Sequence, residues 1–210
     1  MNLIVFDFDG TIVDSLGIFI KTTNSLAKDF GYSSILSSQI PFLRTLSLRE
    51  RIQQLGIPKW KLPFFLQRFR KELNQFMSAL QLVEGMEETF IELRHDYRLG
   101  IVTSNSRQNV EKFLQLQKLD YLFEFIYGGQ ILSGKTSRLK KLVKLNQLQP
   151  QQLIYVGDET SDIKAAKEAK VTNIAVSWGF NTHEVLAQKA PDVIIDRPEH
   201  LLAAIEQVIQ

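Results

Sequence analysis

The feature that most constrains this chain is a short apolar segment near its start that runs directly into two acidic residues. Leu3-Ile4-Val5-Phe6 is followed by Asp7-Phe8-Asp9-Gly10-Thr11. A short apolar run that ends at turn residues is typical of a strand buried on both faces of a sheet. Open α/β sheets bind ligands beyond the carboxyl ends of their parallel strands, which is where Asp7 and Asp9 would lie. We therefore expect a ligand site at these two carboxylates.

The spacing of the two carboxylates indicates their chemistry. Side chains at positions i and i+2 can converge on one hard cation, and one of them can attack an electrophile whose negative charge the cation offsets. The pair is consistent with a magnesium-assisted aspartyl nucleophile. The alternative is that Asp7 and Asp9 only form turn hydrogen bonds before Gly10.

Composition narrows the class of protein. A chain of 210 residues suits one large domain or one domain with a smaller insertion. The net charge of +2, without a sustained basic stripe, argues against a nucleic-acid partner. The absence of cysteine excludes disulfides and thiolate chemistry, so any metal must be held by oxygen. No signal-like start and no membrane-length apolar run is present, and we expect a cytoplasmic protein with no membrane partner.

A long segment after the first acidic pair has helical periodicity and no strand-like runs. Across residues 15–82 apolar residues recur three and four positions apart, and the clearest helix spans about 63–80. Phe65, Phe69 and Leu73 mark one face of that helix, a pattern typical of packing. We expect residues 15–82 to form an inserted helical cap domain.

The remainder of the chain alternates strands and helices. Strands are predicted at 98–103, 123–127 and 153–156, with further candidates at 172–177 and 193–195, and helices at 86–95, 107–117 and 138–145. Strands separated by helices imply right-handed crossovers and a mainly parallel sheet covered on both faces. We therefore predict an α/β fold with a Rossmann-like, mainly parallel sheet core, made of residues 1–14 and 83–210, and the α-helical cap inserted into it.

Polar groups follow the second predicted strand as directly as Asp7 follows the first. Thr103-Ser104-Asn105 would bring a hydroxyl and the amides after it to the same edge of the sheet, where they can bind phosphate oxygens. The alternative is that Ser104, Asn105 or Ser106 caps the helix that begins near Arg107. These residues alone leave both interpretations open.

A lysine lies between the third predicted strand and the next helix. Lys135, in Gly134-Lys135-Thr136-Ser137, could reach across the strand ends and neutralise both a nucleophile and a phosphate. Other basic residues follow on the next predicted helix: Arg138, Lys140, Lys141 and Lys144. The apolar residues between them form its buried side, so these cations are predicted to lie on a solvated face. Lys135 is therefore the preferred candidate.

Acidic residues cluster again after the fourth predicted strand. Gly157-Asp158-Glu159-Thr160-Ser161-Asp162 places two aspartates four positions apart at the start of a helix rich in small residues. Acidic residues at a helix N-terminus are also favourable without any function. Chance or capping would nevertheless have to explain this cluster and the three preceding groups together.

The four groups resemble the motifs of the haloacid dehalogenase-like (HAD) superfamily, and of its phosphatase branch in particular. Asp-Phe-Asp-Gly-Thr resembles the first motif, and Thr103, Lys135 and the Gly-Asp-x-x-x-Asp of 157–162 resemble the second, third and fourth in the same order. The position of the cap and the segment Ser177-Trp178-Gly179-Phe180 resemble the phosphoglycolate phosphatase-like branch. The chain departs from the family after Lys135, where a proline-containing turn is common and Thr136-Ser137-Arg138 stands instead.

The resemblance implies a reaction through an aspartyl-phosphate. Asp7 would be the nucleophile, and Asp9 the general acid that becomes a general base. Dehalogenases of the superfamily lack this second acid, so Asp9 favours phosphoryl chemistry. The phosphate-binding positions would be Thr103, Ser104, Asn105 and Lys135, and the Mg²⁺ ligands Asp7, Asp158 and the backbone carbonyl of Asp9. Asp162 would support Lys135 or a metal-bound water, and the role of Glu159 is left open.

We expect the protein to be a hydrolase, namely a Mg²⁺-dependent phosphatase. Its substrate would be a small phosphomonoester, such as a phosphoglycolate-like acid. The alternatives are a sugar phosphomutase, a phosphonate hydrolase and a catalytically silent binding protein of the same fold. A phosphonate hydrolase of this family needs a cap lysine, and the candidates that we considered lie in no motif that we recognise: Lys21, Lys28, Lys59 and Lys61. The intact acidic set argues against a silent protein.

One residue of the cap is a candidate for reading the substrate. Arg44 lies in Ile40-Pro41-Phe42-Leu43-Arg44-Thr45-Leu46-Ser47, where a proline-bounded turn carries a cation and two hydroxyls. Its guanidinium could pair with a carboxylate on the substrate. The alternative is a surface arginine beside Arg49 and Glu50, and both interpretations stay open.

Overall fold

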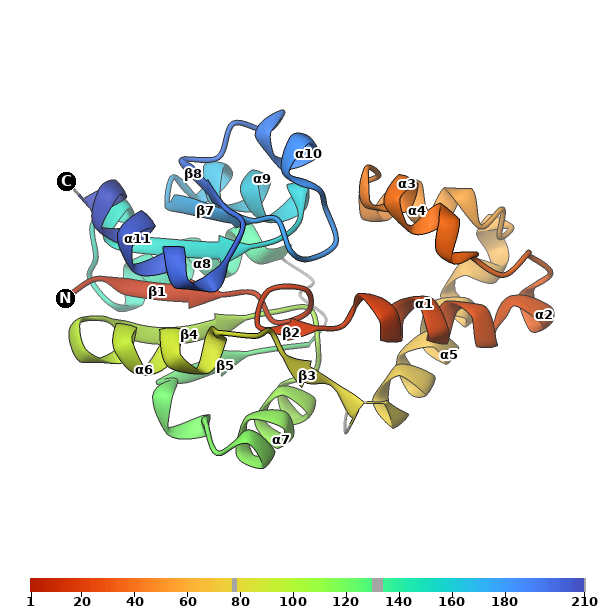
Figure 1. Cartoon of the computed structure of the whole chain (residues 1–210), viewed down its shortest axis with the longest axis horizontal. Helices are drawn as coiled ribbons and strands as arrows, with labels where there is room; N and C mark the ends of the chain where they lie inside the picture. The colour runs from red at the N-terminus through yellow and green to blue at the C-terminus, as the bar shows by residue number, and fades with distance from the viewer. Residues whose placement is uncertain (77–78, 130–133, 210) are drawn as a thin grey trace.

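The computed structural model describes residues 1–76, 79–129 and 134–209. In this part of the chain a six-stranded sheet has the order β5-β4-β1-β6-β7-β8, and every neighbouring pair is parallel (Figure 1). Its strands are β1 (Leu3–Phe6), β4 (Arg98–Val102), β5 (Phe125–Tyr127), β6 (Leu153–Gly157), β7 (Thr172–Val176) and β8 (Val193–Ile195). The predicted Rossmann-like parallel sheet is confirmed.

The register of the sheet aligns the strand ends that carry the motifs. Phe6 of β1 pairs with Ile101 of β4 on one side and with Val156 of β6 on the other. The next residue, Asp7, donates its backbone N–H to the carbonyl of Val156 at 2.9 Å. The carboxyl ends of these three strands therefore lie side by side, although they come from segments about a hundred and fifty residues apart.

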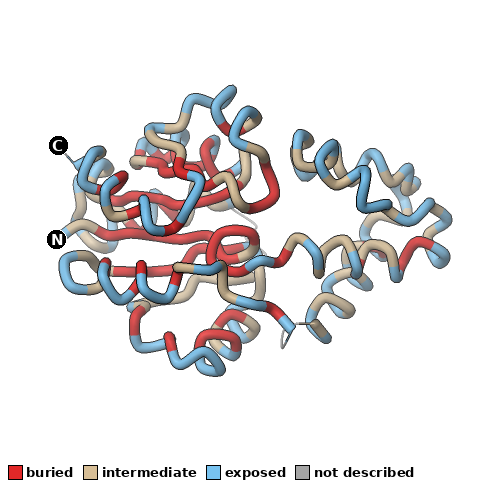
Figure 2. Tube along the Cα trace, viewed as in Figure 1, coloured by how far each residue is buried: buried red, intermediate tan, exposed pale blue. Residues whose placement is uncertain are grey.

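Helices cover both faces of the sheet: α6 (Met86–Asp96), α7 (Arg107–Gln117), α8 (Gly134–Leu145), α9 (Thr160–Ala169), α10 (His183–Ala187) and α11 (Leu201–Ile209). Successive residues of β1 point to opposite faces, as in any strand. Ile4 and Phe6 belong to the core beneath α6, α7 and α11, while Leu3 and Val5 belong to the core beneath α8 and α9. Burial on both faces explains why β1 is a continuous apolar run, and Figure 2 shows the buried residues concentrated in the sheet.

Helices between β2 and β3 lie beyond the end toward which β1 points (Figure 1). They are α1 (Leu16–Ser25), α2 (Ala27–Phe30), α3 (Ile40–Arg44), α4 (Leu48–Gln54) and α5 (Leu62–Gln75), with short 3₁₀ turns at Ser37–Gln39 and Lys59–Lys61. Two short antiparallel strands, β2 (Val13–Asp14) and β3 (Gln81–Leu82), join this part to the sheet. The sequence did not predict this ribbon because two-residue strands carry no periodicity.

The structure corrects several predicted boundaries. The helix predicted to reach Leu80 ends at Gln75, and the buried Leu80 leads into β3 instead. The strand predicted from Phe123 begins at Phe125. Helix α8 begins at Gly134, four residues before the predicted start, because its polar first turn has no apolar periodicity to reveal it. Lys135 therefore lies in the first turn of α8. Within the described residues, none of the helices is long and apolar enough to span a membrane.

Candidate active site

Three buried aspartates meet at the carboxyl edge of the sheet. Asp7 directly follows β1, Asp158 directly follows β6, and Asp162 lies in the first turn of α9. One carboxylate oxygen from each lies within 4.8 Å of the others. Asp158 and Asp162 are fully buried, and Asp7 is nearly so. Oxygen ligands at this separation could hold one hard divalent cation.

Lys135 of α8 lies between two of these carboxylates. Its Nζ donates to Asp7 Oδ2 and to Asp162 Oδ1, each at 2.5 Å. Asp162 Oδ1 also accepts from the hydroxyl of Tyr155, and Asp162 Oδ2 accepts from the backbone N–H of Glu159. Burial lowers the pKa of Lys135, but the charges of Asp162 and Asp7 outweigh it and hold that pKa well above its usual value. The lysine is therefore a charged bridge between the first and fourth motifs.

The carboxylate of Asp158 is held from two sides. Its Oδ1 accepts from the hydroxyl of Thr11 at 2.8 Å, and its Oδ2 accepts from the backbone N–H of Phe180 at 2.7 Å. Gly10, whose φ is +77°, and Gly179 both pack so closely on this carboxylate that a Cβ on either would collide with Asp158 Oδ2. The glycines are needed because the backbone of two loops approaches Asp158 directly.

Burial and mutual repulsion make the acidic cluster electrostatically unfavourable on its own. Desolvation and the charge of Asp162 raise the pKa of Asp7 to about 6, although Lys135 lowers it. Desolvation and the charges of Glu159, Asp162 and Asp7 raise the pKa of Asp158 well above its usual value. One lysine does not offset three buried carboxylates, so the residues present fit a bound divalent cation, and oxygen donors of this kind suit Mg²⁺.

Asp9 has a partner that the sequence did not predict. Its Oδ2 accepts from the side-chain amide of Asn105 at 2.9 Å. The amide oxygen of Asn105 accepts in turn from the backbone N–H of Ser106 and the side chain of Asn109, which fixes the orientation of the group. Desolvation and the nearby charge of Asp7 raise the pKa of Asp9 to about 7, although Asn105 lowers it. The structure thus brings the second motif into contact with the first through this amide.

The turn after β4 carries one buried and one exposed hydroxyl group. Thr103 is fully buried, and its hydroxyl oxygen accepts from the backbone N–H of Asn105 at 3.1 Å. Ser104 is exposed and lines the same cavity as Asp7. The alternative role in capping falls to Ser106, whose hydroxyl accepts from the backbone N–H of Asn109 at the start of α7.

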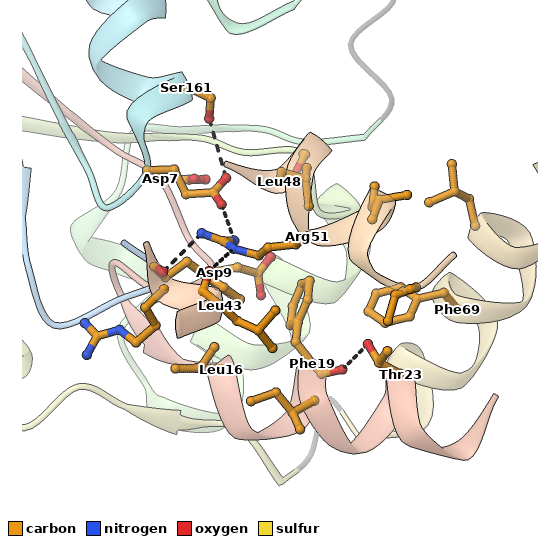
Figure 3. Close-up of a pocket in the computed structure, with 18 of the residues that line it drawn as sticks. Asp7, Asp9, Leu16, Phe19, Thr23, Leu43, Leu48, Arg51, Phe69 and Ser161 are labelled. Carbon is orange, nitrogen blue, oxygen red and sulfur yellow. Dashed lines mark hydrogen bonds and ion pairs between the residues drawn. The ribbon is translucent and has the colours of Figure 1, made fainter. Parts of the chain in front are cut away.

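A cavity of about 530 Å³ extends from the carboxylates into the space between α1, α3, α4 and α5. Asp7, Asp9 and Lys135 line one part of it. Figure 3 shows Asp7 and Asp9 on one side of the view, with Phe69 and Thr23 on the other. The candidate nucleophile therefore opens into a pocket of the size that binds small molecules.

Two arginines of the helical segment contact the core. Arg44 donates from Nη2 to the carbonyl of Ser177 at 2.6 Å and from Nε to that of Gly179 at 2.9 Å. Arg51 forms an ion pair with Glu159 at 2.7 Å and donates to the carbonyl of Phe180 at 3.0 Å. The guanidinium of Arg44, the sequence's candidate for reading a substrate carboxylate, thus bonds backbone carbonyls of the core loop 177–181.

Several contacts of the site were not predicted from the sequence. Thr11 lies in the first motif, and the segment Ser177–Phe180 was noted as a resemblance, so a signal existed for both. Arg51 had none, because an arginine in a short amphipathic helix is typical of a solvated face. Arg51 is the partner of Glu159, whose role the sequence left open. Their pairing joins segments more than a hundred residues apart.

Comparisons with known proteins identify the family of this chain. The family model of haloacid dehalogenase-like hydrolases matches residues 4–176. A phosphoglycolate phosphatase from Synechococcus elongatus is 39% identical over the full length of both chains. Pyrophosphatase PpaX from Bacillus mycoides is 27% identical, covering 99% of this chain and 98% of that one.

Solved structures have the same architecture. A haloacid dehalogenase-like hydrolase from Streptococcus pneumoniae superposes with a TM-score of 0.84 at 26% identity, over 97% of each chain. A protein described as a predicted phosphoglycolate phosphatase from Haemophilus somnus superposes with a TM-score of 0.79 at 25% identity, over 100% of this chain and 98% of the other. With its motifs gathered at one edge of the sheet and relatives that match along its whole length, the chain belongs to the haloacid dehalogenase-like hydrolase family.

Proposed function

We propose that this hydrolase is a Mg²⁺-dependent phosphatase that cleaves a small phosphomonoester through an aspartyl-phosphate. The observation that carries the proposal is the arrangement at the end of β1. Asp7 lines the cavity with its Oδ2 bonded to Lys135, and Asp9 lines the same cavity two residues further on. Full-length similarity to phosphatases supports the same reaction class.

Asp7 is the nucleophile in this proposal. One of its carboxylate oxygens attacks phosphorus in line with the departing alcohol, the new O–P bond forms, and the P–O bond to the alcohol breaks. Lys135, already held between Asp7 and Asp162, orients the carboxylate and offsets negative charge on the phosphoryl oxygens. Ser104, which lines the cavity, and the backbone near it supply further hydrogen bonds to the phosphoryl oxygens. The buried hydroxyl of Thr103 holds this turn by accepting from the backbone N–H of Asn105.

Asp9 moves the protons. It gives its proton to the alcohol oxygen as the first P–O bond breaks, and then takes a proton from the water that attacks the aspartyl-phosphate. The second attack releases inorganic phosphate and restores the Asp7 carboxylate. Asn105 acts on the reaction through Asp9, because its amide donates to Oδ2 and fixes the orientation of the carboxyl group.

Asp7, Asp158 and the backbone carbonyl of Asp9 are the groups that would hold Mg²⁺. The cation, when bound, supplies positive charge that draws the anionic phosphate to the anionic nucleophile. Thr11 and the N–H of Phe180 orient Asp158 for this task. Asp162 is the positioning residue of Lys135, because its Oδ1 accepts from the ammonium and its Oδ2 accepts from the backbone N–H of Glu159.

We further infer that residues 15–82 act as a cap domain inserted between 1–14 and 83–210. The pairing of Val13 with Leu82 joins the two ends of the inserted segment, which supports boundaries at the β2–β3 ribbon. The cavity between the segment and Asp7 supports a role in excluding water from the reaction. The relative at 39% identity makes phosphoglycolate the first substrate to assay.

The test is a screen of phosphomonoesters with Mg²⁺ and with excess EDTA. We expect turnover that stops on chelation and returns with Mg²⁺, and Asp7→Asn should abolish it, since an amide cannot attack phosphorus. Circular dichroism and thermal unfolding of Asp7→Asn check that the fold is retained. Full activity in EDTA, or substantial turnover by a folded Asp7→Asn, would contradict the proposal.

A further inference from the structure

The cavity that begins at Asp7 and Asp9 continues into a wall of apolar side chains. We name this part the apolar chamber and define it by six of its lining residues: Leu16, Phe19, Ile20, Leu43, Ile52 and Phe69. They come from α1, α3, α4 and α5, so the chamber exists only where these helices meet. The rings of Phe19 and Phe69 lie 5.3 Å apart, and the ring of Phe19 lies 4.9 Å from that of Phe180, which extends the aromatic surface toward the core.

We propose that the apolar chamber binds the alcohol part of the substrate, and that the enzyme favours phosphomonoesters of uncharged, apolar alcohols. This inference rests on the proposed phosphatase function, because the phosphate must lie at Asp7 for its alcohol to enter the chamber. A two-carbon acid phosphate of about nine non-hydrogen atoms would fill roughly half of the cavity, taking the ~30 Å³ that one water molecule occupies in the liquid for each atom. The remaining space suits a longer, apolar group.

The charges around the cavity support an uncharged alcohol. Four cations line it, and each has a partner among the described residues. Lys135 bonds Asp7 and Asp162, Arg51 bonds Glu159, and Lys164 faces Glu168 at 3.9 Å. Arg44 bonds carbonyls of the loop 177–181. A second anionic group on the substrate would compete with carboxylates of the protein for Lys135, Arg51 and Lys164, and with backbone carbonyls for Arg44.

The hydroxyl that lines the far part of the chamber is also satisfied within the protein. Thr23 donates to the backbone carbonyl of Phe19, one turn earlier in α1, at 2.8 Å (Figure 3). The one hydrogen-bond donor of Thr23 is therefore already used, and the apolar side chains of the chamber give a substrate hydroxyl nothing to replace its hydrogen bonds to water. An alkyl or aromatic group would lose none and would bury apolar surface against the walls.

The test measures kcat/KM for the n-alkyl phosphates from ethyl to hexyl phosphate, with phosphoglycolate beside them. We expect kcat/KM to rise up to about fourfold for each added methylene group, the factor that ~0.8 kcal/mol corresponds to, and hexyl phosphate to exceed phosphoglycolate. Ile52→Phe should reduce the ratio of hexyl to ethyl phosphate by filling the chamber. Gln53→Phe puts the same side chain on the exposed neighbouring position of α4 and should leave that ratio unchanged.

Measurements of phosphonate binding distinguish a failure of this inference from a failure of the proposed phosphatase function. Hexylphosphonate and ethylphosphonate cannot be hydrolysed at their P–C bond by the proposed reaction, and calorimetry with the Mg²⁺-loaded protein should give tighter binding of the hexyl compound, again reduced in Ile52→Phe. A flat or falling alkyl series together with equal phosphonate affinities would overturn the inference while leaving the phosphatase intact. Tighter hexylphosphonate binding without Asp7-dependent turnover would support the chamber and refute the phosphatase.

Discussion

Replacing Lys135 by methionine should destabilise the protein strongly as well as inactivate it. Methionine has a similar length but no charge, so the substitution removes the bridge between Asp7 and Asp162 while keeping most of the apolar contacts of the side chain. The side chains of all three residues are at most 15% exposed. Two carboxylates would then face one another with no cation between them.

The expected cost follows from that burial. Removal of one partner from a buried ion pair typically costs ~3–5 kcal/mol, because the remaining charge is left without compensation. Here the lost ammonium serves two carboxylates, so we expect at least the middle of that range, about 4 kcal/mol. With a urea dependence of roughly 2 kcal/mol per molar, the unfolding midpoint should fall by about 2 M.

The assay is urea unfolding in EDTA, since bound Mg²⁺ would offset part of the lost charge. Lys164→Met is the matched control: its ammonium is largely exposed and lies 3.9 Å from Glu168, so the change should stay within about 0.5 kcal/mol. The double variant Lys135→Met with Asp162→Asn should regain part of the stability but none of the activity. A loss below about 1 kcal/mol for Lys135→Met would refute the bridge as a structural element.

Two further predictions concern the proton transfers and the contacts between cap and core. Asp9→Asn should slow hydrolysis of an alkyl phosphate by about 10²–10⁴-fold. It should slow hydrolysis of an activated aryl phosphate far less, because the leaving group of the aryl phosphate needs little protonation. Equal losses on the two substrates would show that Asp9 is not the general acid. Arg44→Ala should free the loop 177–181 that bonds Asp158, so we expect a higher Mg²⁺ requirement and a lower kcat/KM on every substrate. A rise in KM confined to carboxylated substrates would instead favour Arg44 as a substrate-reading residue.

Much of the fold could be predicted because its signals are local. A strand buried on both faces must be a short apolar run, and β1, β4 and β6 each are. A parallel sheet then places the residues after such strands at one edge, whatever their distance along the chain. This rule alone brings Asp7, Thr103 and Asp158 to one edge of the sheet. The missed β2–β3 ribbon and the early start of α8 carry no comparable period, which is why they could not be predicted.

The sequence by itself thus determined which groups gather at the edge of the sheet, while only the tertiary structure decided their partners. Asn105 bonds Asp9 across 96 positions, and Arg51 meets Glu159 across 108. Hydrogen bonds and ion pairs of this kind depend on where rigid elements come to rest, and no local pattern encodes that placement. The same holds for the apolar chamber. Ile52 and Phe69 have the spacing of ordinary packing residues, and only the arrangement of the helices leaves a cavity between them. The physical reason is that periodicity defines which face of a helix is apolar, but not whether a neighbouring helix or a ligand covers that face.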